Sequence, residues 1–93
     1  MITIHKFLLP KIGYQEIAIQ GYQRVLNVKE QREVIVLYAL VDTNSALAGM
    51  TLPVLVIRTG LDVCRPDFLE NWKFIDTVSI VTLMWHVFVR ESE

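Results

Sequence analysis

Few side chains in this 93-residue sequence are of the types that carry out catalysis or bind metals. The chain has one cysteine, Cys64, and two histidines, His5 and His86, and no CxxC or HxxxH spacing gathers them as metal ligands. Nucleophilic catalysis would need Cys64 or a serine close to a histidine and a third group that orients it. Because both histidines lie in alternating, strand-like patterns, we expect them to be ordinary strand residues. We expect Cys64 to be a small buried or half-buried thiol. No metal site is expected.

The carboxylates do not suggest a catalytic pair either. Glycoside hydrolysis needs two acids in one cleft, whereas the acids here fall in predicted turns or near the end of the chain. No GxGxxG and no GxxxxGK[ST] is present, so the sequence predicts no phosphate-binding loop. We therefore predict a protein that is not an enzyme and that holds no cofactor. The acids considered are Glu30, Glu33, Asp42, Asp62, Asp67 and Glu70.

The composition excludes several classes of protein. Nine Lys and Arg residues balance ten Asp and Glu residues, so neither a protein that wraps nucleic acid nor an acidic mimic of DNA is expected. With 53% hydrophobic residues the chain is too apolar to be intrinsically disordered. Aromatic residues stand near arginines at Tyr22–Arg24 and again over 85–90, but core packing accounts for these aromatics better than RNA stacking does.

The ends of the chain and its cysteine indicate a compartment. The first ten residues lack the apolar core of a signal peptide, and the most apolar run, 78–89, is shorter than the roughly 20 residues that a helix needs to span a bilayer. A single thiol forms no internal disulfide, which is typical of a reducing compartment. We expect a cytoplasmic protein that does not bind membranes.

Apolar and polar residues alternate with a period of two along most of the chain, which predicts strands. The run 74–90 would be roughly 56 Å long as one strand, longer than a domain of this size allows, so it must fold back near 80–82. The uninterrupted apolar run 34–41 predicts a central strand that is buried on both faces. The other strands are expected at 1–9, 15–20, 23–29 and 51–59.

One short helix is predicted near 66–72. Asp67 stands at a capping position with Glu70 three residues later, the spacing of a capping box. Phe68, Leu69 and Trp72 would form its apolar side, and a helix this short must dock on the rest of the protein. The predicted fold is mainly β: a single domain, 1–93, forming a small antiparallel β sandwich or half-open barrel of six or seven strands.

This chain has more apolar residues than so small a core can bury. Some of the surplus is therefore expected to close an interface, with another protein or with a second copy of the chain. A small open sheet leaves edge strands to be covered, so we expect a homo-oligomer formed by pairing of edge strands.

Segments along nearly the whole chain, in order, resemble a family of short phage-encoded proteins of unknown function. Tyr38 stands where that family usually has tryptophan, and residues 61–73 form a longer segment than in its members. The segments are Ile4-His5-Lys6-Phe7-Leu8-Leu9-Pro10, Gln15-Glu16-Ile17-Ala18-Ile19, Arg24-Val25-Leu26-Asn27-Val28, Leu37-Tyr38-Ala39-Leu40-Val41-Asp42, Arg58-Thr59-Gly60, Phe74-Ile75-Asp76-Thr77 and Trp85-His86-Val87-Phe88.

The resemblance implies a phage accessory protein that acts on the host, most often by inhibiting an antiviral effector (an anti-CRISPR or other anti-defence protein). The contact surfaces would be the loop 43–49 and the segment 62–72. Arg58 and Arg65 would make polar contacts, and Phe68, Leu69 and Trp72 would be apolar anchors. One alternative is an oligomeric sponge for a small anionic nucleotide signal. Its ligand-binding residues would be Arg58, Thr59, Arg65 and His86. Another alternative is a virion or assembly component.

Overall fold

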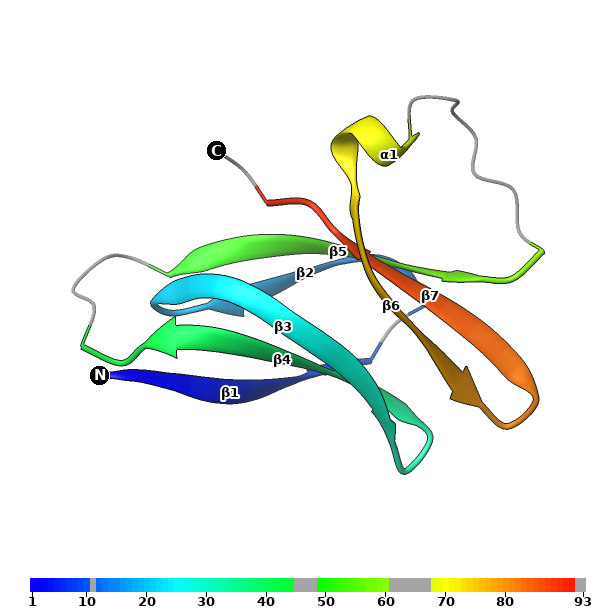
Figure 1. The fold of residues 1–93 in the computed structure, drawn as a ribbon, viewed down its shortest axis with the longest axis horizontal. Coiled ribbons are helices and arrows are strands. Elements are labelled where there is room, and N and C mark those ends of the chain that lie inside the picture. The colour runs from blue at the N-terminus through cyan, green and yellow to red at the C-terminus, as the bar shows by residue number, and fades with distance from the viewer. Residues whose placement is uncertain (11, 45–48, 61–67, 92–93) are drawn as a thin grey trace.

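Seven strands in two antiparallel sheets make up the protein, as a computed structural model shows for residues 1–10, 12–44, 49–60 and 68–91 (Figure 1). One sheet has the order β1-β4-β3 and the other has the order β2-β5-β7-β6. This confirms the predicted mainly β, sandwich-like fold. The strands are β1 (Ile2–Leu9), β2 (Gly13–Ile19), β3 (Tyr22–Gln31), β4 (Val34–Asp42), β5 (Met50–Arg58), β6 (Lys73–Ile80) and β7 (Leu83–Val89).

The core lies between the two sheets and is built from every second residue of the central strands. Leu52, Val54 and Val56 of β5 point into it, and Val87 and Val89 of the neighbouring β7 do the same. From the other sheet, β4 contributes Ile35, Leu37, Ala39 and Val41. On β5 this matches the expected division of the strand into two faces, with Val54 and Val56 on the same side.

Burial of β4 on both faces is confirmed for one face only. On its outer face Val36 is fully buried, but Val34 is exposed and Tyr38 and Leu40 are half-buried. The apolar run 34–41 therefore continues onto a partly exposed surface.

The turn between β2 and β3 crosses from one sheet to the other at Gly21. Its φ is +70°, and a Cβ at this position would lie 2.2 Å from the carbonyl oxygen of Asp42. The Asp42 N–H donates to the Gly21 carbonyl at 2.8 Å, which fixes the crossing against the end of β4. Glycine is needed here both for the backbone angle and for this close approach.

Two hairpin turns use residues that are unusual for their backbone angles. The predicted reversal near 80–82 is confirmed: Ile80 pairs with Leu83, and Val81 has a φ of +58°. Between β3 and β4 the turn residues Arg32 and Glu33 have φ values of +53° and +65°. The carboxylate of Glu30 accepts a hydrogen bond from the Glu33 N–H at 2.6 Å and so supports this second turn.

The predicted helix ends one residue earlier than expected. Its described part is α1 (Phe68–Asn71), so Trp72 follows the helix instead of belonging to it. Pro66 and Asp67, which carry the predicted start and cap, lie outside the described residues. The described part of the chain contains no helix capable of crossing a bilayer.

Candidate functional site: an aromatic face on the four-stranded sheet

A row of apolar side chains crosses the outer surface of the four-stranded sheet. Tyr14 of β2 pairs with Leu55 of β5, Leu55 pairs with Phe88 of β7, and Phe88 pairs with Phe74 of β6. Residues directly opposite each other in an antiparallel pair share a face. Since the neighbours Val54, Val56, Val87 and Val89 point into the core, the whole row points outward.

The row is partly exposed. Tyr14 retains 49% and Phe74 48% of its accessible surface, and Leu55 and Phe88 are half-buried. The Phe74 and Phe88 rings meet edge to face with their centroids 5.5 Å apart. This packing holds Phe74 in place while leaving one side of its ring to the surroundings.

Trp72 and Arg90 lie against this row. The Trp72 ring meets the Tyr14 ring edge to face at 6.2 Å, and the Arg90 guanidinium carbon lies 5.1 Å from the centre of the Trp72 ring. The Arg90 N–H donates to the Pro53 carbonyl at 3.0 Å, which places Arg90 beside β5. We call Tyr14, Trp72, Phe74, Phe88 and Arg90 the aromatic face.

Tyr14 has a polar neighbour on the same face. Its hydroxyl donates to the Glu16 carboxylate at 2.6 Å, and this hydrogen bond raises the pKa of Tyr14. The bond directs the hydroxyl along the strand, so the ring edge next to Trp72 is fixed as well.

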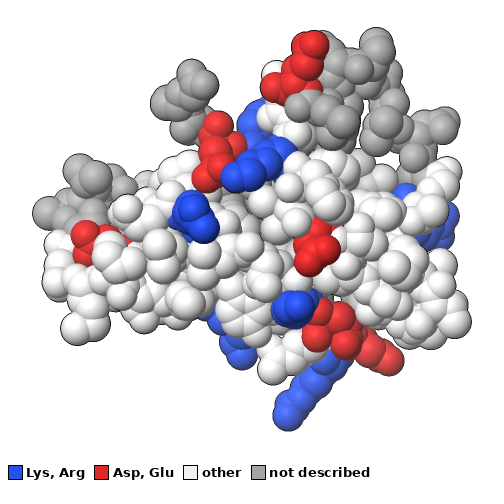
Figure 2. All heavy atoms as spheres, viewed as in Figure 1, with Lys and Arg blue, Asp and Glu red and all other residues white. Residues whose placement is uncertain are grey.

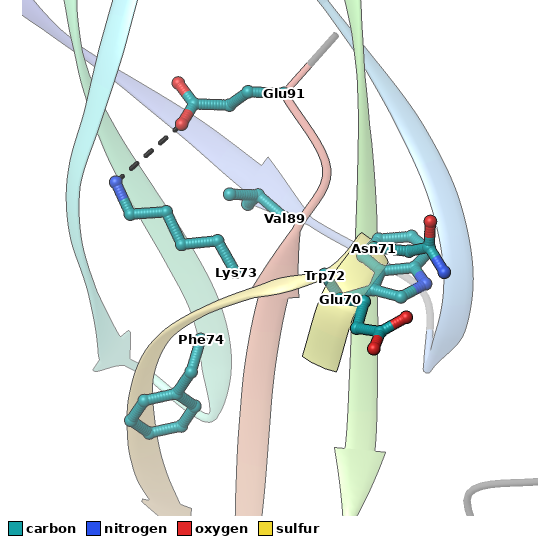
Figure 3. Close-up of a pocket in the computed structure, with 7 residues that line it drawn as sticks. All are labelled: Glu70, Asn71, Trp72, Lys73, Phe74, Val89 and Glu91. Carbon is teal, nitrogen blue, oxygen red and sulfur yellow. Dashed lines mark ion pairs between the residues drawn. The ribbon is translucent and has the colours of Figure 1, made fainter. Parts of the chain in front are cut away.

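A pocket of about 460 Å³ adjoins the aromatic face where α1 leads into β6 (Figure 3). On one side of it Lys73 Nζ and Glu91 Oε1 are 3.7 Å apart, and the Tyr22 hydroxyl donates to the other oxygen of Glu91. Burial of Tyr22, together with this hydrogen bond, raises its pKa. The lining mixes charges of both signs with aromatic rings: Glu70, Asn71, Trp72, Lys73, Phe74, Val89 and Glu91.

His86 lies in the next row of the same sheet and uses both ring nitrogens. Its Nε2 is 2.6 Å from the Thr59 hydroxyl, and its Nδ1 is 2.8 Å from the Thr77 hydroxyl. A hydroxyl both donates and accepts, so the two threonines satisfy either neutral tautomer. This arrangement ties β5, β7 and β6 together.

The structure brings together some of the predicted site residues. Trp72 lies on the aromatic face, and Thr59 and His86 are in contact. Arg58 pairs with Trp85, whose side chain is in the core, so strand alternation directs Arg58 away from the face that carries His86. Arg65 lies outside the described residues, as do the side chains of Phe68 and Leu69, most of the segment 62–72 and residues 45–48 of the predicted contact loop.

Sequence reasoning missed Tyr14 and Phe74 for identifiable reasons. The expected second strand began at Gln15, which left Tyr14 outside it. In β6 the pairing shifts between Phe74 and Asp76, so a bulge turns Phe74 outward although Val78 points inward. The aromatic residues of β7 were expected to pack in the core. This is confirmed for Trp85, which is 9% exposed, but is wrong for Phe88, which pairs with Leu55 on the outer face.

Charges of both signs are interspersed on the face of the protein that Figure 2 shows. In Figure 2 the basic and acidic side chains are scattered over the visible surface, and uncharged atoms cover most of the area between them. A nucleic-acid site would show a continuous basic patch or stripe. Among the described residues, His, Cys, Asp and Glu form no group of three that could hold a metal ion.

The fold and the aromatic face define a small, mainly β domain of two antiparallel sheets with an exposed apolar surface. Residues 1–93 match the family described as "Domain of unknown function (DUF7352)", and the protein belongs to this family. No curated protein and no solved structure matches the chain.

Proposed function

We propose that the protein works by binding another protein through the aromatic face, and that it catalyses no reaction. The observation behind this proposal is that Tyr14, Phe74 and Trp72 stand on an outer sheet surface with Arg90 stacked on the tryptophan. Tryptophan, tyrosine and arginine are the residue types that dominate the binding energy of protein interfaces.

The aromatic face has the composition of an interface centre. Its rings are held by neighbouring rings, so little side-chain freedom remains to be lost when a partner binds. Charged groups lie at its margin, at Glu16 and in the Lys73–Glu91 pair. An apolar centre with a polar rim is the usual anatomy of a specific protein contact.

The finer proposal is a phage accessory protein that inhibits a host antiviral effector in the host cytoplasm. It depends on the resemblance of the ordered sequence segments to phage-encoded proteins. The aromatic face gives this role a surface, because a rigid aromatic patch suits an inhibitor that acts by covering part of its target.

The test is to express the protein in bacterial strains that each carry one defence system and to challenge them with a phage which that system blocks. Wild-type protein is expected to restore plaque formation against one system and to co-purify with its effector. The face variants Trp72→Ala and Phe74→Ser are expected to bind that effector at least about 30-fold more weakly, the loss typical of an interface hot spot.

Ile12→Ser is the matched control, because Ile12 is equally apolar and 66% exposed but lies outside the aromatic face. Circular dichroism and thermal unfolding establish that each variant is folded. Full rescue by both face variants would contradict the proposed surface. Failure to rescue any system, with no effector recovered, would contradict the anti-defence role.

The sponge for a small anionic nucleotide is the less favoured proposal. Thr59 and His86 do meet, but each already bonds to the other, and Arg58 belongs to the opposite side of the sheet. Thermal shift against a panel of cyclic nucleotides separates the two roles, since a bound ligand raises the unfolding temperature according to its concentration relative to Kd. Mass spectrometry of purified particles tests the virion or assembly role.

A further inference from the structure

We infer that β1 pairs with β1 of a second copy, antiparallel and about a two-fold axis at His5, so that two three-stranded sheets become one continuous sheet. This inference is independent of the proposed function, because it uses the other sheet and an edge instead of a face. It rests on the direction of the backbone groups of β1, on the side chains along this edge and on the register that they permit.

The strand β1 is the last strand of its sheet, and Figure 1 draws it at the margin of the molecule. Its pairing with β4 runs without a shift from Ile2↔Asp42 to Leu9↔Ile35. Thr43 N–H donates to the Met1 carbonyl at 2.8 Å, so the odd-numbered residues of this strand turn their backbone groups towards β4. The N–H and C=O groups of Ile2, Ile4, Lys6 and Leu8 therefore point away from the sheet.

Apart from Lys6, the devices that usually protect an edge strand are missing from β1. Edges are commonly blocked by a proline, a bulge or charged side chains, lysine above all. Within its eight residues β1 has no proline, its ladder with β4 has no bulge, and Lys6 is its one lysine or acid. The side chains of Ile2, Ile4 and Leu8 are 52%, 56% and 58% exposed. By contrast, β3 is bulged in two places and lies beside β6.

A second copy of β1 fits this edge in one register. With the axis at His5, Ile2 lies opposite the partner's Leu8 and Ile4 lies opposite the partner's Lys6. All four residues whose N–H and C=O groups point away from the sheet are then paired with each other. The lysine stem then covers an isoleucine while its ammonium stays in water. An axis at Lys6 would oppose two lysines, and an axis at Ile4 would leave Leu8 unpaired. This fit of charge and length selects a second copy as the occupant.

Strand-edge pairing buries less surface than the roughly 1,600 Å² of a standard interface, so the dimer is expected to depend on concentration. Sedimentation velocity over a concentration series measures it. The wild-type chain should shift from monomer towards dimer as its concentration rises.

Cysteine cross-linking tests the register in a Cys64→Ser background. His5→Cys places two thiols opposite each other across the axis, with Cα atoms about 4.5 Å apart, so mild oxidation should link the copies rapidly. Lys6→Cys places its two thiols on a diagonal at about 7–8 Å, so it should link far more slowly. A mixture of Ile4→Cys and Lys6→Cys chains should form the heterodimer.

Charge substitution supplies the second arm. Ile4→Lys sets a lysine opposite the partner's Lys6, twice in the symmetric dimer, and should weaken dimerisation roughly tenfold. Adding Lys6→Glu to Ile4→Lys should restore the dimer. Circular dichroism checks that these exposed changes leave the fold intact. A chain that stays monomeric at its highest soluble concentration, equal cross-linking at positions 5 and 6, or a dimer unaffected by Ile4→Lys would overturn the inference.

Discussion

His86 shows how one polar side chain can organise the surface of a sheet. It occupies the middle strand of three, and its two nitrogens contact hydroxyls contributed by the chain just after β5 and by β6. Because the ring is half-buried, water replaces these contacts only in part when they are removed. His86 is therefore expected to contribute to stability.

A double-mutant cycle between His86 and Thr77 measures this contribution. Thr77→Val and His86→Phe are each expected to lower the free energy of unfolding by about 0.5–1.5 kcal/mol, the usual net value of a hydrogen bond. The double variant should lose less than the sum, because both changes remove the same Thr77–His86 contact. Urea unfolding gives the values, with Thr51→Val at the other end of β5 as the control. Strict additivity would show that the contact contributes nothing.

The sequence predicted His86 as a paired or half-exposed strand residue, and this is confirmed. It could not predict the partners of His86. Thr59 and Thr77 stand 27 and 9 residues away along the chain, and only the order β5-β7-β6 brings them to the two sides of the ring. Local alternation contains no information about strand order.

At the scale of the elements, the hydrophobic pattern predicted the strands, the reversal within 74–90 and the division of β5 into two faces. It failed where the period changes: the register shift between Phe74 and Asp76 turns Phe74 outward. The predicted helix ran one residue too far at its C-terminal end, because the capping-box pattern does not fix where a helix stops.

The β6–β7 turn offers a test at this scale. Val81 has a φ of +58°, a conformation that costs a β-branched residue roughly 1–2 kcal/mol, and its side chain is 78% exposed. Val81→Gly removes that strain and loses little packing. We expect the free energy of unfolding to rise by about 1 kcal/mol, although the added chain entropy of glycine offsets part of the gain.

The neighbouring position provides the control for this prediction. Thr82 is not among the residues of positive φ, so Thr82→Gly has no strain to relieve and should destabilise the hairpin. Denaturant unfolding of the two variants side by side measures the difference. If Val81→Gly were as destabilising as Thr82→Gly, the left-handed conformation at Val81 would be wrong.

At the scale of the whole molecule, the two sheets meet through the apolar core, and a polar link joins them at its margin. Tyr22 begins β3 in one sheet, and Glu91 follows β7 in the other. The Tyr22 hydroxyl donates to the Glu91 carboxylate, which also pairs with Lys73. Since Glu91 also lines the pocket beside the aromatic face, this link connects the packing of the sheets to the shape of the candidate site.

Tyr22→Phe is expected to lower the free energy of unfolding by about 1 kcal/mol. A fully buried hydrogen bond to a charged group would contribute more, but this pair is partly exposed. Burial and the Glu91 bond raise the pKa of Tyr22 in the folded state. The stabilisation is then fully present below the usual tyrosine pKa of about 10 and declines as the pH rises above it. Urea unfolding from neutral to alkaline pH measures the difference in free energy of unfolding between the wild type and Tyr22→Phe. This difference should be constant at first and then shrink as the pH rises. Tyr38→Phe, which changes a half-buried tyrosine on β4, serves as the control. An advantage that grew with pH would contradict a hydroxyl that donates to Glu91.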